Sequence, residues 1–218
     1  FNDKLFLNPI KIIKAFDKES FVEAFELIHY FQRKNFYLFG YIKYEAYNFF
    51  LEINENYRSK LPILYFEVYE TFQEYKFDIK GSGQIHIATI ENIDKDKYMV
   101  DINKIKNYIS MGKTYEVNYT YPSIVCTDCN DDYLLYKSIL KHQKTNYNAY
   151  IKNEYETILS FSPELFFKIE NNKIITKPMK GTIKRGKNKD EDLENINFLK
   201  TDEKNMAENV MIVDLLRN

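Results

Sequence analysis

The stretch YNAYIKNEYETILSFSPELFFKIENNKIIT, Tyr147 to Thr176, carries the pattern that decides the fold. Aromatic and β-branched residues recur along it in short runs, which favour strands over helices. Pro163 and the pair Asn171-Asn172 interrupt these runs at residue types that are typical of turns. The stretch therefore predicts three to four strands joined by short turns, as in an antiparallel sheet.

Helical patterns flank this strand-rich stretch on both sides. In the first of them, Ser20 with Glu23 fits a capping box, and the apolar residues share one helical face: Phe21, Ala24, Phe25, Ile28 and Phe31. Helices are predicted over residues 17–33, 98–111 and 131–142 and, as a pair broken near Thr201-Asp202, over residues 191–216.

Further strands are predicted near the N-terminus and in the middle of the chain. Aromatic runs at Phe36–Tyr44 and Leu61–Phe72 suit antiparallel strands, and the alternating segment GKTYEVNYTYPSIV follows the second helix as another. The charged, glycine-containing segment Glu74–Gly83 predicts an exposed, mobile connection between an N-terminal region of about residues 1–80 and a core of about residues 84–218. Strand runs interrupted by helices, without regular alternation, indicate an α+β fold.

Composition and charge exclude several classes of function. The 218 residues are 44% hydrophobic, which suffices for a core, and the formal net charge of −1 provides no general attraction for nucleic acid. No apolar run approaches the roughly 18 residues that cross a bilayer, and no charged and then apolar leader opens the chain, so we expect no membrane association and a soluble, cytoplasmic protein. Cys126 and Cys129 lack a histidine partner at metal spacing and are predicted to be reduced thiols.

A cluster of cations in KPMKGTIKRG, Lys177 to Gly186, points to chemistry at one lysine. Lys180 precedes a Gly-Thr turn, where a small ligand can approach the backbone closely. A neutral lysine amine is a nucleophile, and nearby positive charge favours the neutral form. The neighbouring cations are Lys177, Lys184, Arg185 and Lys187. The same charges also fit a solvated basic loop or an anion-binding loop, and spacing alone does not choose between these interpretations.

Two carboxylates accompany this lysine. Glu164 stands in FSPELFF, whose apolar residues would favour a protonated carboxyl, and hence a general acid, if the side chain turned inward. A hairpin after Glu164 would return residues 177–180 to the same end of the sheet. Glu208 lies on a predicted helix on the face of Met211, Ile212 and Leu215, where a carboxylate needs a partner: a cation such as Mg²⁺, or a lysine.

Four motifs together make the chain resemble the chorismate-utilising enzymes, and among them the aminodeoxychorismate synthases, also called para-aminobenzoate synthase component I. The motifs are GKTYEVNYT, FSPELFF, PMKGT and KNMAENVMIVDLLRN. The resemblance implies a two-layer antiparallel sandwich with flanking helices. It also implies a transferase that aminates chorismate to 4-amino-4-deoxychorismate for folate synthesis, with ammonia from a glutamine amidotransferase partner.

The resemblance also implies roles for individual residues. Lys180 matches the nucleophile, where anthranilate synthases typically carry alanine, and Glu164 matches the acid that protonates the departing hydroxyl. Gly181 and Thr182 match the turn that contacts substrate, and Glu208 matches one ligand of a catalytic Mg²⁺.

Two alternatives remain open at this point. An anthranilate synthase or isochorismate synthase type of enzyme would share the fold and the magnesium site, and a catalytically silent anion-binding module would explain the basic loop alone. Because the sequence starts without methionine and stops at Asn218 inside a helical pattern, we expect a fragment. The resemblance implies that a second magnesium ligand and further catalytic groups belong to the family's C-terminal part, so we expect these residues to be inactive by themselves.

Overall fold

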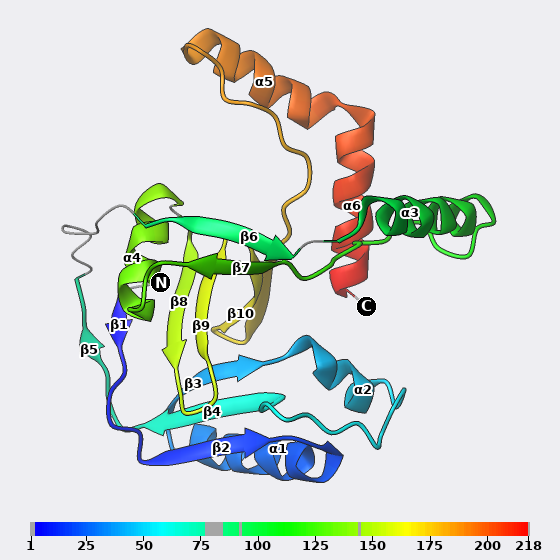
Figure 1. Cartoon of the computed structure of the whole chain (residues 1–218). Coiled ribbons are helices and arrows are strands. Elements are labelled where there is room, and N and C mark those ends of the chain that lie inside the picture. The colour runs from blue at the N-terminus through cyan, green and yellow to red at the C-terminus, as the bar shows by residue number, and fades with distance from the viewer. Residues whose placement is uncertain (1–2, 77–84, 92, 144, 218) are drawn as a thin grey trace. The chain divides into compact units, whose positions relative to one another are not determined.

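The computed structural model describes residues 3–76, 85–91, 93–143 and 145–217 (Figure 1). The chain forms two compact units. One comprises Phe1–Asp78 and Gln143–Asn218, and the other comprises Ile79–His142. Both contain helices and small antiparallel sheets, so the predicted α+β class is confirmed.

The first unit begins with a three-stranded antiparallel sheet covered by one helix (Figure 1). Its strands are β2 (Lys11–Ala15), β4 (Leu64–Tyr69) and β3 (Tyr37–Ile42), in that order, and helix α1 (Lys18–Arg33) packs against them. Shorter elements are β1 (Lys4–Leu5) paired with β5 (Gln73–Glu74), and a 3-10 turn (Tyr44–Ala46) leading into α2 (Tyr47–Phe50). The core between sheet and helix contains Ile13, Ala15, Phe21, Ala24, Ile28, Phe49, Ile63, Leu64 and Val68.

Helix α1 and its apolar face are confirmed, but its predicted cap is wrong. The capping box pairs Asp17 with Ser20: the Ser20 amide donates to Asp17 Oδ1 at 3.0 Å, and the Asp17 amide donates to Ser20 Oγ at 3.2 Å. Asp17 has an extended backbone, with φ −148°, so the helix begins one turn earlier than a Ser20–Glu23 box requires.

Replacing Asp17 by alanine should lower the free energy of unfolding by about 1 kcal/mol at pH 7. The hydrogen bond from the Ser20 side chain lowers the pKa of Asp17 below its ordinary value of 3.8. The contribution is therefore complete above that ordinary pKa and is lost as the pH falls through the folded-state value. Urea unfolding at pH 7 and pH 3 measures this. Glu23→Ala is the control, and an equal loss in both variants would contradict the assigned cap.

Gly40 in β3 is predicted to be intolerant of any side chain. A Cβ there would lie 2.0 Å from the Tyr65 carbonyl oxygen and 2.7 Å from Phe66 Cα, both backbone atoms of β4. The two strands would have to separate, so Gly40→Ala should cost about 3 kcal/mol of unfolding free energy or more, measured by urea denaturation. Gly112→Ala is the comparison: its Cβ has open space, so only its φ of +68° should cost about 1 kcal/mol. Equal losses would contradict the steric explanation.

The strand-rich stretch of the sequence forms two antiparallel hairpins, as predicted. The first pairs β8 (Tyr147–Lys152) with β9 (Thr157–Ser162), and the second pairs β10 (Leu165–Glu170) with β11 (Lys173–Lys177). Asn171 and Asn172 form the second turn with φ of 50° and 58°, a conformation that asparagine tolerates better than most residues.

The turn of the first hairpin is bound to the N-terminal sheet by charged and phenolic groups. Glu156 accepts a 2.6 Å hydrogen bond from the Tyr41 hydroxyl and pairs with Lys43 at 2.7 Å. Lys14 pairs with Glu154 at 2.9 Å. These contacts join the N-terminal and the C-terminal parts of the chain within the first unit. The predicted boundary near residue 80, between an N-terminal region and a core, stays a prediction.

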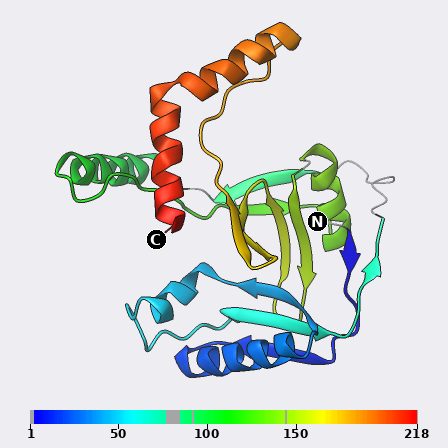
Figure 2. The same ribbon diagram turned by 180° about the vertical axis from the view of Figure 1, so that it is seen from behind.

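The first unit ends in two helices, as predicted: α5 (Lys189–Thr201) and α6 (Glu203–Arg217), separated by Asp202. Figure 2 shows the segment after β11 running to α5, and α6 turning back from it.

Among its described residues, the second unit contains one antiparallel pair of strands and two helices, both of which were predicted. Strand β6 (Ile87–Glu91) pairs with β7 (Ile124–Thr127), and the helices are α3 (Lys95–Ser110) and α4 (Asp132–His142). The strand predicted throughout GKTYEVNYTYPSIV is wrong before Ile124, because β6 offers a partner only to residues 124–127 and Pro122 has no amide hydrogen. Most of the predicted connection at residues 74–83 lies outside the described residues.

Cys126 and Cys129 carry free thiols.

Among the described residues, no helix is both long and apolar enough to span a membrane.

Candidate active site

The β10–β11 hairpin brings Glu164 to the PMKGT loop, which we define as residues 178–182. Because Leu165 pairs with Lys177, the residue before β10 and those after β11 lie at one end of the hairpin, as predicted. The Met179 amide donates a 3.0 Å hydrogen bond to Glu164 Oε1. The carboxylate is thus fixed beside the residue that precedes Lys180.

Glu164 itself is exposed. Its backbone is held by Ser162, whose hydroxyl accepts from the Glu164 amide at 3.2 Å and donates to the Glu164 carbonyl at 3.0 Å. Phe166 and Phe167 lie at a register shift of the hairpin, where their rings contact each other with centroids 5.2 Å apart, and they are 74% and 52% exposed. The described residues therefore do not form the apolar enclosure that an inward-turned Glu164 would need.

The PMKGT loop rests on the first turn of α6. Gly181 has a φ of +74°, and a Cβ added there would lie 2.7 Å from Asn205 Oδ1. Lys180 and Gly181 are half-buried, and Thr182 is exposed. Gly181 thus supplies both the left-handed backbone and the close approach to α6.

Glu208 lies on α6 three residues after Asn205, and therefore on the same side of the helix as the loop contact. Its side chain is 36% exposed, and Lys204 Nζ lies 3.9 Å from Oε1. A lysine partner was the alternative to a metal, and an exposed pair at this distance stabilises little. The expected apolar stripe is uneven, since Ile212 is buried and Leu215 is 57% exposed.

A complete metal site is not found in the part of the chain that the structure describes, where no group of three or more acidic, histidine or cysteine side chains could hold an ion. Glu208 fits the role of a single carboxylate ligand. A magnesium ion bound there would need its remaining ligands from water, substrate or other protein groups.

One of the predicted cations is bound elsewhere. Arg185 pairs with Asp192 in α5, its Nε lying 3.0 Å from Oδ2, and this guanidinium lowers the pKa of the Asp192 carboxyl. Asn195 also donates to the Lys184 carbonyl at 3.0 Å. Residues 184–186 are therefore bound to α5. Because the Arg185 charge is paired with Asp192, it does not add to the positive charge expected around Lys180.

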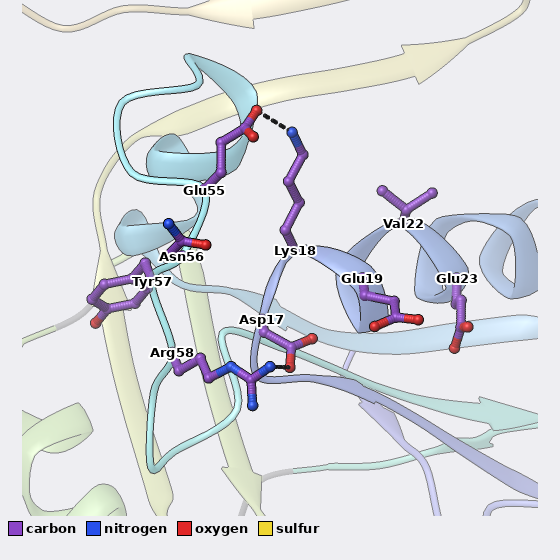
Figure 3. Close-up of a pocket in the computed structure, with 9 residues that line it drawn as sticks. All are labelled: Asp17, Lys18, Glu19, Val22, Glu23, Glu55, Asn56, Tyr57 and Arg58. Atoms are coloured by element: carbon purple, nitrogen blue, oxygen red, sulfur yellow. Dashed lines mark hydrogen bonds and ion pairs between the residues drawn. The ribbon is translucent and has the colours of Figure 1, made fainter.

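A surface pocket elsewhere in the first unit contains none of the predicted site residues (Figure 3). Its charged lining pairs internally, Lys18 with Glu55 and Arg58 with Asp17, and Glu19 and Glu23 leave it net acidic. Such a lining disfavours an anionic ligand.

Sequence reasoning missed the contact of Asn205 with the PMKGT loop. The sequence predicts the helix break at Thr201-Asp202, and the spacing of Asp202 and Asn205 also fits a helix cap and its third residue. The packing on Gly181 depends on the path of the intervening chain.

Comparisons with known proteins identify several relatives of the chain. It is 40% identical over 145 residues to a probable chloroplastic aminodeoxychorismate synthase of Oryza sativa, an alignment covering 65% of this chain and 16% of that protein. It is 34% identical over 167 residues to aminodeoxychorismate synthase component 1 of Bacillus subtilis, covering 77% and 33%. It is 34% identical over 133 residues to anthranilate synthase component 1 of Acetivibrio thermocellus, covering 61% and 26%.

The chain thus spans between 16% and 33% of the length of these relatives. No solved structure matches it significantly. The model of the family described as chorismate binding enzyme matches residues 75–218, and these residues contain all four motifs of the resemblance. Since this match covers most of the sequence, the chain belongs to the family of chorismate binding enzymes.

Proposed function

We propose that the protein carrying this chain aminates chorismate to 4-amino-4-deoxychorismate with Lys180 as a covalent nucleophile. The observation that supports the proposal best is the hydrogen bond from the Met179 amide to Glu164, because it sets an acid beside the loop that carries the lysine. Similarity to aminodeoxychorismate synthases of a plant and a bacterium supports the same choice of substrate and product.

The reaction divides one substitution into two additions. The neutral Lys180 amine adds to C2 of chorismate while the C4 hydroxyl leaves as water, with its proton supplied by Glu164. Ammonia then adds to C4, the bond from C2 to the lysine nitrogen breaks, and the released protons restore the Glu164 carboxyl and Lys180. Chorismate and ammonia thus become 4-amino-4-deoxychorismate and water.

Other groups have supporting roles in this proposal. Gly181 and Thr182 contact the substrate at the turn, and a glutamine amidotransferase partner delivers the ammonia. Magnesium, with Glu208 as one ligand, would neutralise a substrate carboxylate. The expected cytoplasmic location stays a prediction.

Product identification tests the proposal directly. The full-length protein is incubated with chorismate, Mg²⁺ and ammonium, and the products are separated and identified by mass spectrometry. We expect 4-amino-4-deoxychorismate from the full-length protein and no turnover by residues 1–218 alone. Anthranilate as the product would favour the anthranilate synthase alternative, and unchanged chorismate in the presence of the full-length protein would contradict both enzymes.

A further inference from the structure

The hydroxyl of Ser162 is bound twice to the backbone of Glu164. It accepts a hydrogen bond from the Glu164 amide at 3.2 Å and donates one to the Glu164 carbonyl at 3.0 Å. The two bonds fix the backbone from which the Glu164 carboxylate extends. We propose that Ser162 is a positioning residue for the acid Glu164, an inference that rests on the proposed function.

The connection between β9 and β10 consists of Pro163 and Glu164. Because β9 ends at Ser162 and β10 begins at Leu165, Glu164 lies outside the ladders of both hairpins. Pro163 has no amide hydrogen to donate. A hydroxyl can donate and accept at the same time, so one serine side chain binds both polar groups of the Glu164 backbone.

The other end of Glu164, its carboxylate, is held by the PMKGT loop. Oε1 accepts from the Met179 amide at 3.0 Å, and Met179 directly precedes Lys180. A shift of the Glu164 backbone would therefore move the carboxylate away from the Met179 amide and from the loop that carries the amine. Ser162 thus acts on the proposed reaction through the placement of the acid.

Replacing Ser162 by alanine removes both bonds to the Glu164 backbone. A displacement of a reacting group by about 1 Å can cost up to about 100-fold in rate, so Ser162→Ala should lower kcat by about 10- to 100-fold and change KM much less. Ser162→Thr keeps the hydroxyl, whereas Ser162→Val has the shape of threonine without it. The threonine variant should retain most of the rate, and the valine variant should not. Steady-state kinetics of the full-length protein with chorismate, Mg²⁺ and ammonium measure these rates.

Ser59→Ala is the matched control. The Ser59 hydroxyl accepts from the Leu61 amide at 3.2 Å, the same local bond that Ser162 makes to Glu164, but Ser59 precedes β4 in the N-terminal sheet. Its replacement should leave kcat and KM unchanged.

A double variant shows whether Ser162 acts through the acid. Glu164→Gln cannot donate the proton, so in this background there is no acid left to position. Ser162→Ala should therefore lower kcat much less in Glu164→Gln than in the unmodified protein. Equal fold losses in the two backgrounds would indicate a general effect on the hairpin and would contradict the inference.

A second measurement needs no turnover. Hydrogen exchange of the Glu164 and Met179 amides, followed by mass spectrometry at residue resolution, reports whether their acceptors are in place. Both amides should exchange several-fold faster in Ser162→Ala and Ser162→Val than in the unmodified protein. Neither should change in Ser162→Thr or Ser59→Ala. Loss of the folded circular dichroism signal in Ser162→Ala would make the serine a structural residue and would also contradict the inference.

The two proposals fail in different ways. If the full-length protein forms no 4-amino-4-deoxychorismate, the proposed function is wrong, and the exchange of the Met179 amide still decides whether Ser162 holds the Glu164 carboxylate in place. If the protein is active and depends on Glu164, yet Ser162→Ala leaves kcat or the exchange of the Met179 amide unchanged, the positioning role of Ser162 is wrong.

Discussion

Replacing Lys180 by alanine should lower the rate of 4-amino-4-deoxychorismate formation by at least about 1000-fold, because losing a covalent nucleophile removes the route through two easier steps. The residue stands between Met179, whose amide binds Glu164, and Gly181, which packs on α6. Its removal should leave both contacts in place, since they are made by its neighbours. The rate is measured with full-length protein, chorismate, Mg²⁺ and ammonium.

The matched control is Lys173→Ala, which removes an equal charge at the exposed turn end of β11. It should retain nearly the full rate, since it lies at the opposite end of the hairpin from the PMKGT loop. In the absence of ammonia, intact-mass spectrometry of the unmodified protein should detect an adduct of chorismate less one water, and Lys180→Ala should not form it. A Lys180→Ala variant with an unimpaired rate would rule out the lysine route.

Replacing Glu164 by glutamine should lower kcat by about 100- to 10000-fold, the range that a general acid contributes. Glutamine keeps a carbonyl oxygen that can accept from the Met179 amide, so the geometry at 3.0 Å is preserved and only proton donation is lost. Measured at saturating chorismate, the loss should therefore appear in kcat more than in KM.

Glu170→Gln provides the comparison for this variant. Glu170 lies at the far end of β10, exposed and paired with Lys168 at 2.8 Å, so its loss should leave kcat unchanged. Equal kcat values for Glu164→Gln and the unmodified protein would remove Glu164 from the reaction. A fall for Glu170→Gln as large as that for Glu164→Gln would instead indicate a general effect on the hairpin.

Local patterns predicted most of the elements correctly. Apolar spacing located the face of α1 on which Phe21, Ala24 and Ile28 are buried, and turn residues located both ends of the β10–β11 hairpin. These features depend on residues a few positions apart, so the local order of residues is sufficient to predict them. The proximity of Glu164 to the PMKGT loop was predicted from the same hairpin.

Predictions that needed a partner elsewhere in the chain were less successful. The alternation before Ile124 suits a strand, but strand β6 pairs only with residues 124–127. Arg185 looked like a neighbour of Lys180, yet Asp192 on α5 binds it. The apolar residues around Glu164 do not enclose it, because Phe166 and Phe167 pack on each other and are largely exposed.

The amino-acid sequence by itself determined the family, the α+β class and the residue types of the proposed chemistry, because motifs and periodicity are local properties of the chain. Only the tertiary structure decided that Gly181 packs on Asn205, and that the N-terminal sheet and the first hairpin share one unit through Tyr41 and Glu156. Such contacts join residues 24 and 115 positions apart, and their formation depends on the path of everything between them.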